Sequence, residues 1–469
     1  MPDESPVTAM PPPPPAVVPR WSDRFTPLLS TLEIDRAVFY SVAARILQIA
    51  GFPVTMVLIA RCLTPQLQGF YYTFGSVLSL QMFVELGFTY VIVNVASHEW
   101  AHLSLDENGF ITGDAQSLSR LVSLGRLIFR WYAVAALLFV AGAVSLGWYF
   151  FSRGPGTDVR WEGPLIGVVV VSGFLLWALP FNALLEGCNQ VANINRLRLT
   201  QTVLESAALW VTLLLGGGLW AAAAAITAKL LRDLYLVFVE YRNFFKPFFD
   251  LPLIARVSWR NEIWPMQWRL ALAGVAMYFA SALYNPVMFR YHGPSVAGQM
   301  GMTLQMVTGM QLIPMAWVLT KAPRYGMLIA QKNYEALDRL WLRNSLISLG
   351  IVIAGASCVW LVVYLLNISH AALAQRMLSP AVVALFLCCA VLLQAVQCFV
   401  AYLRAHKREP ILAANITTAT VAGLLVWFLG SRLGPTGAAI GNVVQMLLTF
   451  FWIGTIWWRR RAEWHGLTT

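Results

Sequence analysis

A nine-residue motif that occurs twice constrains the fold of this chain most strongly. It stands at residues 61–69 as RCLTPQLQG and at residues 290–298 as RYHGPSVAG. In each copy an apolar run ends at an arginine, a proline follows four residues later, and a glycine follows four residues after that. Proline is tolerated in the first turn of a helix but ends the helix before it, while glycine lets two backbones approach closely. Each copy therefore predicts a turn between two hydrophobic helices.

The two copies belong to a longer internal repeat. The arginines, prolines and glycines of the motif are each 229 residues apart (290 minus 61). Later matches are closer together: Arg120 corresponds to Arg339 at 219 residues (339 minus 120), and Ala224 corresponds to Ala438 at 214 (438 minus 224). A duplicated domain with shortened loops would leave such a decreasing separation. The sequence therefore predicts two homologous halves.

Bulk composition places the chain in a membrane. Of its 469 residues, 58% are hydrophobic and 12% are charged, and the mean hydropathy of +0.64 is too high for a soluble globule. Apolar runs long enough to cross the bilayer number about twelve. We therefore expect an all-α polytopic membrane protein with about twelve transmembrane helices in two repeat-related six-helix lobes. The expected spans are 37–60, 70–96, 127–151, 165–188, 200–216, 219–241, 267–289, 297–320, 342–366, 380–403, 411–429 and 437–458.

The positive charges indicate the topology. Of the 33 Lys and Arg residues, 24 fall on one side of the expected spans, six on the other and three within spans. Because cytoplasmic loops retain Lys and Arg, both termini are expected in the cytoplasm. The net charge of +11 does not predict nucleic-acid binding, since the basic residues form no stripe or aromatic-interleaved patch. Membrane lipids, and no nucleic acid, are therefore expected as partners.

Five segments follow from this reading. Residues 1–31 are polar and Pro-rich and are expected to form a disordered cytoplasmic tail. Residues 32–243 form the first six-helix lobe, and residues 266–461 form the second. Between them, residues 244–265 alternate aromatic and basic residues with prolines, which predicts a cytoplasmic interfacial linker. Residues 462–469 form a second cytoplasmic tail.

Ionisable residues inside spans are the candidates for a substrate cavity, because a charge in the bilayer must face water or a partner. The first half carries many, whereas the second half carries amides in their place. The competing interpretation is a set of ion pairs between helices, above all for Lys229, Arg232 and Asp233, which share one turn. The candidate cavity residues are Arg45, Glu85, Glu186, Glu205, Lys229, Arg232, Asp233, Gln305 and Gln397.

Arginines and prolines at matching positions of the repeat suggest two further roles. Arg61 and Arg290 are candidates for gripping a diphosphate; the alternative is that they reach lipid headgroups or cap the last carbonyls of their helices. Pro53 and Pro286 lie one turn apart in the frame of the repeat, and we expect each to act as a hinge.

No metal site is expected. Residues 98–102 read HEWAH, which matches the pattern of zinc proteases, but no third ligand accompanies it, and a catalytic zinc needs three. The six cysteines also lack the spacing of a metal site or of a disulfide framework, which indicates packing roles.

The residues around the first motif copy carry a resemblance to a known family. Residues 60–71, ARCLTPQLQGFY, resemble the "a-R-x-L-x-P-x-x-x-G-x-Y" signature of bacterial polysaccharide and O-antigen flippases of the multidrug/oligosaccharidyl-lipid/polysaccharide (MOP) superfamily. Residues 434–440, GPTGAAI, look like that family's turn before the last span, and residues 185–189, LEGCN, look like its fourth-span ending. The resemblance extends over about residues 32–461. It implies two lobes in a V around a central cavity, and alternating access that is often coupled to an ion.

On this basis we expect a flippase for undecaprenyl-diphosphate-linked oligosaccharide in a bacterial inner membrane. Arg45 would contact the diphosphate or a sugar, and Glu85 would supply its counter-charge or a proton site. A polysaccharide polymerase or export complex is an expected partner, and H⁺ or Na⁺ is the expected coupling ion, with no other cofactor. The chief alternative is an ion-coupled multidrug or small-cation antiporter of the same superfamily. An integral-membrane glycan polymerase or metalloprotease is the third candidate, and we expect no enzyme.

Overall fold

A computed structural model describes residues 36–85, 87–154, 158–406 and 411–465. The tail predicted at residues 1–31 lies outside this part. Helices dominate, and a short antiparallel hairpin of β1 (Leu103–Leu105) and β2 (Ile111–Gly113) lies between them. The helices are α2 (Arg36–Cys62), α3 (Pro65–Leu78), α4 (Met82–Glu85), α5 (Phe88–Trp100), α6 (Ala115–Ser152), α7 (Glu162–Gly187), α8 (Val191–Leu214), α9 (Trp220–Tyr235), α10 (Arg242–Asp250), α11 (Trp264–Ser281), α12 (Tyr284–His292), α13 (Pro294–Ala330), α14 (Tyr334–Ile368), α15 (Pro380–Ala405) and α16 (Leu412–Trp464). Short segments η1 (Ser79–Gln81), η2 (Leu236–Glu240), η3 (Trp259–Ile263) and η4 (Ala374–Arg376) connect some of them.

The chain has the helices of a polytopic membrane protein. In the described ranges, 8 helices are long and apolar enough to cross a bilayer, or 9 if the bent pair of Pro65–Glu85 and Phe88–Trp100 is one span. The expected number of twelve stays a prediction. Two features make the number of candidate spans smaller than twelve. Helix α9 has only 16 residues, and the 53-residue α16 is counted once although it is two helices joined across a kink at Gly434.

The kink in α16 confirms the turn predicted at residues 434–440. Gly434 has φ 65° and ψ −147°, and Pro435 follows it. A positive φ strains any residue with a side chain, so glycine suits this position. Three residues later, a Cβ on Gly437 would lie 2.2 Å from the carbonyl oxygen of Leu429. The two arms of α16 can approach this closely only because both residues are glycine.

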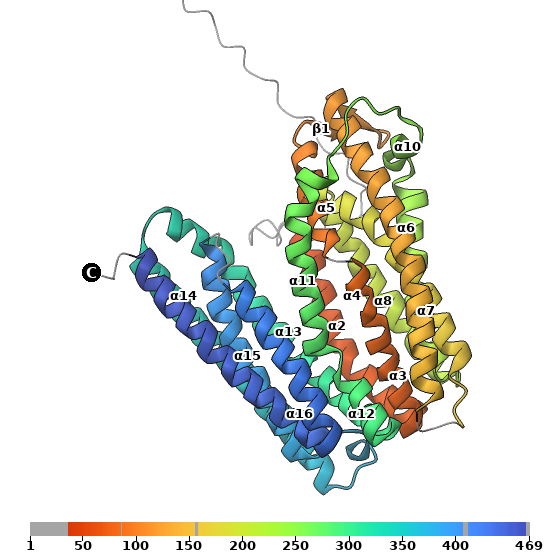
Figure 1. Ribbon diagram of the computed structural model, residues 1–469, viewed down its shortest axis with the longest axis vertical. Helices are drawn as coiled ribbons and strands as arrows, with labels where there is room; N and C mark the ends of the chain where they lie inside the picture. Colours follow the sequence, from red (N-terminus) through yellow and green to blue (C-terminus); the bar gives the residue numbers. More distant parts are fainter. Residues whose placement is uncertain (1–35, 86, 155–157, 407–410, 466–469) are drawn as a thin grey trace, which may run out of the picture.

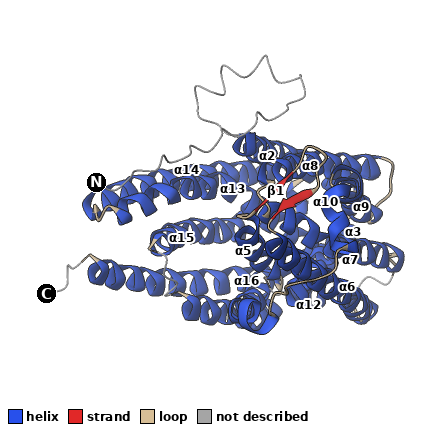
Figure 2. Cartoon of the chain, turned by 90° about the horizontal axis from the view of Figure 1, so that it is seen from above, coloured by secondary structure: helices blue, strands red, loops and turns tan. Residues whose placement is uncertain are grey.

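The helices form two groups that converge at one end and diverge at the other (Figure 1). One group holds α2–α9, and the other holds α12–α16. In Figure 2, α14 and α15 lie on the opposite side of the view from α6, α7 and α9. We call the end where they converge the α12 end, and the opposite end, which carries the hairpin, the β1 end. Helix α11 contacts both groups, since it packs against α16 and also against α4 and α5.

The expected span 70–96 is not one continuous helix. It bends by 45° between α4 and α5, where Gly87 has φ +66°. Helix α11 passes directly over this bend: a Cβ on Gly87 would lie 2.8 Å from Cβ of Leu270. The bend therefore requires glycine both for its backbone angle and for the close approach of α11.

The linker predicted at residues 244–265 is docked onto the first group. Its α10 buries Phe244, Phe245 and Phe248, and a Cβ on Gly125 of α6 would lie 2.2 Å from the ring of Phe248. The Arg126 guanidinium donates to the carbonyl oxygens of Phe248 at 2.7 Å and Leu251 at 2.6 Å. These contacts fix the segment that leads into α11 against α6.

The extended residues after α10 are held by two serines of α6. The Ser119 hydroxyl accepts from the backbone N–H groups of Ile254 and Ala255, and the Ser123 hydroxyl accepts from that of Val257. Because the extended segment has no strand beside it, these side chains satisfy backbone groups that would otherwise need water.

Candidate functional site between the two helix groups

The two copies of the repeated motif meet at the α12 end. Thr64 caps α3 by accepting from the Leu67 N–H, and Pro65 and Pro294 each begin a helix, as the motif predicts. The helices that they begin, α3 and α13, pack tightly against each other. The prediction that the motif glycines let two backbones approach is confirmed, and the backbones are those of the two copies.

The contact is closest at the motif glycines. A Cβ on Gly69 would lie 1.8 Å from the carbonyl oxygen of Pro294, and a Cβ on Gly298 would lie 2.9 Å from the backbone nitrogen of Gly69. Beside them the Gln68 side-chain amide donates to the carbonyl oxygens of Gly298 at 2.9 Å and Arg376 at 3.1 Å. We call this contact of the two motif copies the α3–α13 seal.

Further contacts strengthen the same end. The Arg290 guanidinium donates to the carbonyl oxygen of Arg153 at 2.5 Å, and the Asn285 amide donates to that of Tyr72 at 3.3 Å. The Phe70 ring lies 4.9 Å from that of Phe289, between centroids. All the hydrogen bonds that we find in the described ranges between α2–α9 and α12–α16 lie at this end.

The structure therefore gives Arg290 a partner that the sequence did not indicate. Arg153 follows the last residue of α6, so Arg290 caps the final turn of a helix in the other group rather than of its own. Arg61 lies exposed at the same end. The two arginines are thus at one end of the molecule, and their diphosphate role stays a prediction.

Glu85 lies at the bend of the second span, half-buried. The Thr89 hydroxyl donates to its carboxylate at 2.7 Å and lies 3.3 Å from the hydroxyl of Tyr132, which is fully buried. The bend places this carboxylate beside α11, because Gly87 and Leu270 are in contact two residues away. Thr89 and Tyr132 are polar partners that spacing along the sequence does not single out.

Arg45 is the exposed cation of the first span. It lies on α2, and among the described residues it makes no hydrogen bond or ion pair. Helix α2 packs mainly against α8, where the Trp210 indole N–H donates to the Thr55 hydroxyl at 2.8 Å. Glu205, on the same helix as Trp210, is half-buried.

The residues predicted to share one turn of α9 form a buried polar cluster within the first group. Asp233 is only 2% exposed, and its carboxylate accepts from the amides of Asn182 at 2.9 Å and Gln201 at 2.7 Å. Lys229 and Arg232 supply neighbouring positive charge. Arg232 also pairs with Glu240 at 3.0 Å. The cluster joins α7, α8 and α9, which fits the competing interpretation of interactions between helices.

Two other predicted positions bear on the site less directly. Glu186, at the end of α7, pairs with Arg198 at 2.6 Å on the β1 end. Glu99 of the HEWAH segment pairs with Arg120 at 2.7 Å, and Arg120 also binds Glu262 of η3 at 2.6 Å. In the part of the chain that was searched for metal ligands, no group of three His, Cys, Asp or Glu residues gathers.

The amides of the second group mostly connect helices. The buried Gln394 side chain donates to the Ser348 hydroxyl at 2.6 Å and to the Pro314 carbonyl at 3.2 Å. Gln305 and Gln397 are half-buried. One buried oxygen of Gln305 has no partner among the described residues. Their assignment to a substrate cavity stays a prediction.

The predicted hinges occupy different local structures. Pro53 lies inside the continuous helix α2. Pro286 lies in the first turn of α12, just after a break at Ala282 and Leu283 that separates α11 from α12. A short break between two helices thus lies near Pro286, although residues 270–292 still count as one candidate span, whereas α2 has no break at Pro53.

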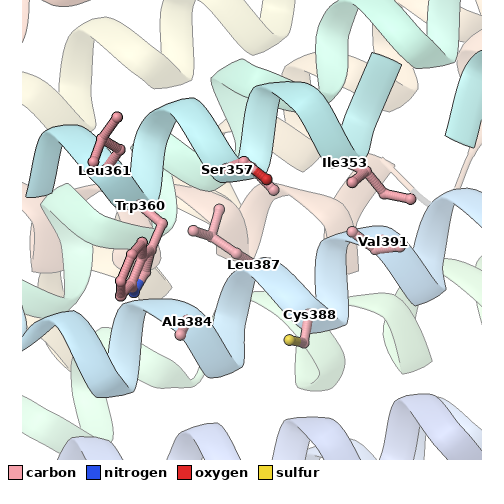
Figure 3. A pocket seen from close by; sticks show the side chains of 9 residues that line it. Ile353, Ser357, Trp360, Leu361, Ala384, Leu387, Cys388 and Val391 are labelled. Atoms are coloured by element: carbon pink, nitrogen blue, oxygen red, sulfur yellow. The ribbon is translucent and has the colours of Figure 1, made fainter. Parts of the chain in front are cut away.

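An apolar cavity lies away from all of these polar residues. It has a volume of about 550 Å³ and lies between α14 and α15, where Ile353, Trp360, Leu387 and Val391 line it (Figure 3). Its polar side-chain atoms are few, and none of the predicted cavity residues takes part. An apolar groove of this kind does not suit a polar substrate group.

Comparisons with known proteins give the fold. No protein-family model and no curated protein matches the sequence. A structure described as the inward-facing conformation of a multidrug resistance MATE family transporter of the MOP superfamily superimposes with a TM-score of 0.63 at 14% identity, covering 92% of this chain and 99% of the other. Its outward-facing counterpart gives 0.52 at 15% identity, covering 94% and 99%. A MATE structure in the straight conformation gives 0.51 at 16% identity, covering 92% and 96%.

Proposed function

We propose, on the premise that this chain has the MATE-like fold of the MOP superfamily, that it is an alternating-access transporter. The observation that carries the proposal is the α3–α13 seal. Hydrogen bonds and glycine contacts join the two helix groups at the α12 end, while the groups diverge at the β1 end (Figure 1). A transporter that admits its substrate from one side needs such a barrier on the other.

In this proposal the β1 end faces the cytoplasm. The loops at that end carry most of the Lys and Arg residues, which supports the assignment. The TM-score against the inward-facing transporter, 0.63, also exceeds that against the outward-facing one, 0.52. The α12 end would then be the outer end, and the structure would be an inward-facing state. Rocking of the groups about a pseudo-two-fold axis would open the seal.

The proposed substrate is an undecaprenyl-diphosphate-linked oligosaccharide in a bacterial inner membrane. Its glycan would pass between the groups while the lipid tail stays in the bilayer. Arg45 supports this assignment, because it is an exposed cation in a bilayer-crossing helix and has no partner among the described residues. Such a cation is suited to bind a diphosphate through charge-assisted hydrogen bonds.

A leaflet assay tests this function. In a strain that lacks the gene, lipid-linked glycan should accumulate on the cytoplasmic leaflet, and the wild-type gene should reverse the accumulation. Arg45→Ala should fail to complement, and Arg45→Lys should complement in part, since it keeps the charge but not the fork. Arg339→Ala is the control, because it removes an exposed arginine that makes a surface pair with Glu335 within the described ranges. Complementation by Arg45→Ala equal to wild type would refute the proposal.

An ion-coupled multidrug or small-cation antiporter is the second candidate. The carboxylates of the first group favour it, in particular Glu85 at the bend beside α11. A carboxylate there could attract a cation or bind the coupling proton. If the protein is an antiporter, the wild-type gene should raise resistance to cationic drugs in a strain without its main efflux pumps. Glu85→Gln should abolish this increase in resistance. No gain from the wild-type gene would exclude this candidate.

A further inference from the structure

A second cavity, separate from the seam between the helix groups, lies at the α12 end within the first group. Its volume is about 400 Å³, in the range of roughly 300–1,000 Å³ that small-molecule sites occupy. It is open to the surface, and three segments line it: the start of α3 with Thr64 and Leu67, the residues before α7, and the glycine turn between α8 and α9. Unlike the groove between α14 and α15, this cavity contains charged side chains.

Trp220 is the aromatic wall of this cavity. It is the first residue of α9, directly after a turn in which Gly216 and Gly218 have φ of +78° and +54°. The outer edge of its six-membered ring lies along α7, where a Cβ on Gly163 or Gly167 would be 3.2 Å or 2.7 Å from ring atoms. The residue is nevertheless 50% exposed. The ring is thus fixed at one edge while much of its surface faces outward.

Two opposite charges line the same cavity as the ring. Asp158 and Arg160 both line the cavity and are both exposed. Neither makes a hydrogen bond or an ion pair within the described ranges, so their donors and acceptors are available to a ligand. The carboxylate accepts hydrogen bonds and the guanidinium donates several, which together match the mixed donors and acceptors of vicinal hydroxyl groups.

We propose that this cavity is a saccharide-binding subsite on the outer face, with Trp220 as the stacking surface and Asp158 and Arg160 as hydroxyl ligands. The C–H face of a pyranose ring carries partial positive charge, and the face of an aromatic ring carries negative charge, so the two attract. An acidic residue in the cavity disfavours a phosphate or another anion as the ligand. The inference rests on the proposed glycan transport and adds a place where the glycan is received after crossing.

The position of the subsite connects it to the α3–α13 seal. Thr64 and Leu67 line the cavity, and the next residue, Gln68, donates across the seal to Gly298 and Arg376. A saccharide that binds against the first turn of α3 therefore touches the helix that must move when the outer end opens. The subsite is therefore adjacent to the outer end of the seam, within reach of a glycan that has crossed.

Saturation-transfer NMR on the full chain in lipid nanodiscs tests the proposal. The probes are free trisaccharides of neutral hexose, of N-acetylhexosamine and of uronic acid, together with inorganic phosphate. At least one trisaccharide should receive saturation from the wild-type protein. Trp220→Ala should weaken that binding at least tenfold, and Trp220→Phe should retain part of it. Free trisaccharides need no transport to bind, so failure here is distinct from failure of the leaflet assay.

Matched variants separate a binding role from an anchoring role at the membrane surface. Gly167→Ala leaves the charged groups in place but displaces the Trp220 ring, so it should also weaken binding. Gly142→Ala, where a Cβ meets open space, should leave trisaccharide binding unchanged. Trp427→Ala, which removes an exposed tryptophan of α16, should also leave it unchanged. The proposal is overturned if no trisaccharide binds, if Trp220→Ala changes only thermal stability, or if phosphate alone competes for the site.

Discussion

Adding one methyl group to Gly69 should open the outer end of the protein. The new Cβ would lie 1.8 Å from the carbonyl oxygen of Pro294, whereas ordinary contacts begin near 3.4 Å, so the two helices would have to separate by about 1.6 Å (3.4 minus 1.8). The obstacle is backbone, which cannot rotate away as a side chain can. Overpacking of this kind costs about 1–3 kcal/mol, and the cost falls only on the sealed state.

That energy is sufficient to change which state is populated. A bias of about 1–3 kcal/mol corresponds to a factor of roughly 5–150. A protein that is sealed at the α12 end in about 99% of molecules would shift to between roughly 95% and 40% sealed. Gly298→Ala should act in the same direction but more weakly, because its Cβ would lie 2.9 Å from the nearest atom, the Gly69 nitrogen.

Distance measurements by electron paramagnetic resonance can follow this shift. On a cysteine-free background, spin labels at Glu162 and Arg432 report on the α12 end, and labels at Ser104 and Glu335 report on the β1 end. In Gly69→Ala the first distance should increase and the second should decrease. Gly75→Ala is the matched control on the same helix, since a Cβ there meets nothing within 4 Å. If Gly69→Ala and Gly75→Ala give the same distance distributions, the seal is not the barrier that we infer.

Four further outcomes follow from single contacts. Arg290→Ala removes a charged donor worth about 1.5–3 kcal/mol to the Arg153 carbonyl and should lengthen the same α12-end distance, while Arg61→Ala should not. Arg126→Ala removes two hydrogen bonds to the linker and should lower the free energy of unfolding by about 2–5 kcal/mol. Arg130→Ala changes an exposed neighbour and is the control. Equal melting temperatures of the two variants would contradict the docking of the linker. Asp233→Ala leaves two amides unpaired and should cost about 2–6 kcal/mol, against about 0–1 kcal/mol for Glu186→Ala in its exposed pair; similar costs would show that burial of the cluster does not matter. The Ser117 N–H donates to the Asp114 carboxylate and lowers its pKa. The stabilisation from this cap is therefore present above the ordinary aspartate pKa of about 4 and is lost as pH falls below it. In melting temperatures measured against pH, Asp114→Asn should lack this part of the decline at acid pH.

The sequence predicts the helix starts and the close backbone approach at the motif glycines, but not that the two motif copies contact each other or which polar partners lie beside them. The motif glycines recur at a fixed separation, and a need for close backbone approach is the physical reason for both, whereas their contact with each other is seen only in the structure. Gln68 is different, because one glutamine in an apolar run does not reveal that its acceptors are Gly298 and Arg376. Such pairings depend on how helices from distant segments are placed.

The same limit applies inside the first helix group. Lys229, Arg232 and Asp233 were recognised as neighbours because they share one turn, yet the amides that bind Asp233 come from α7 and α8. The sequence also does not predict the bend at Gly87, since the span 70–96 contains no proline and is mostly apolar. An isolated glycine after a carboxylate was the available signal, but glycine is common in membrane helices and so predicts little by itself.

The attachment of the linker to α6 limits where the protein can deform. The chain between α10 and η3 is hydrogen-bonded to Arg126, Ser119 and Ser123 of α6. This connection is therefore rigid and does not act as a flexible linker. A rotation of the second half relative to the first must then occur beyond Trp264, and the short break at Ala282 and Leu283 between α11 and α12 is the first interruption of helix there. Lengthening the connection with flexible residues would therefore leave turnover unchanged, whereas a rigid helix through residues 282–283 would arrest it.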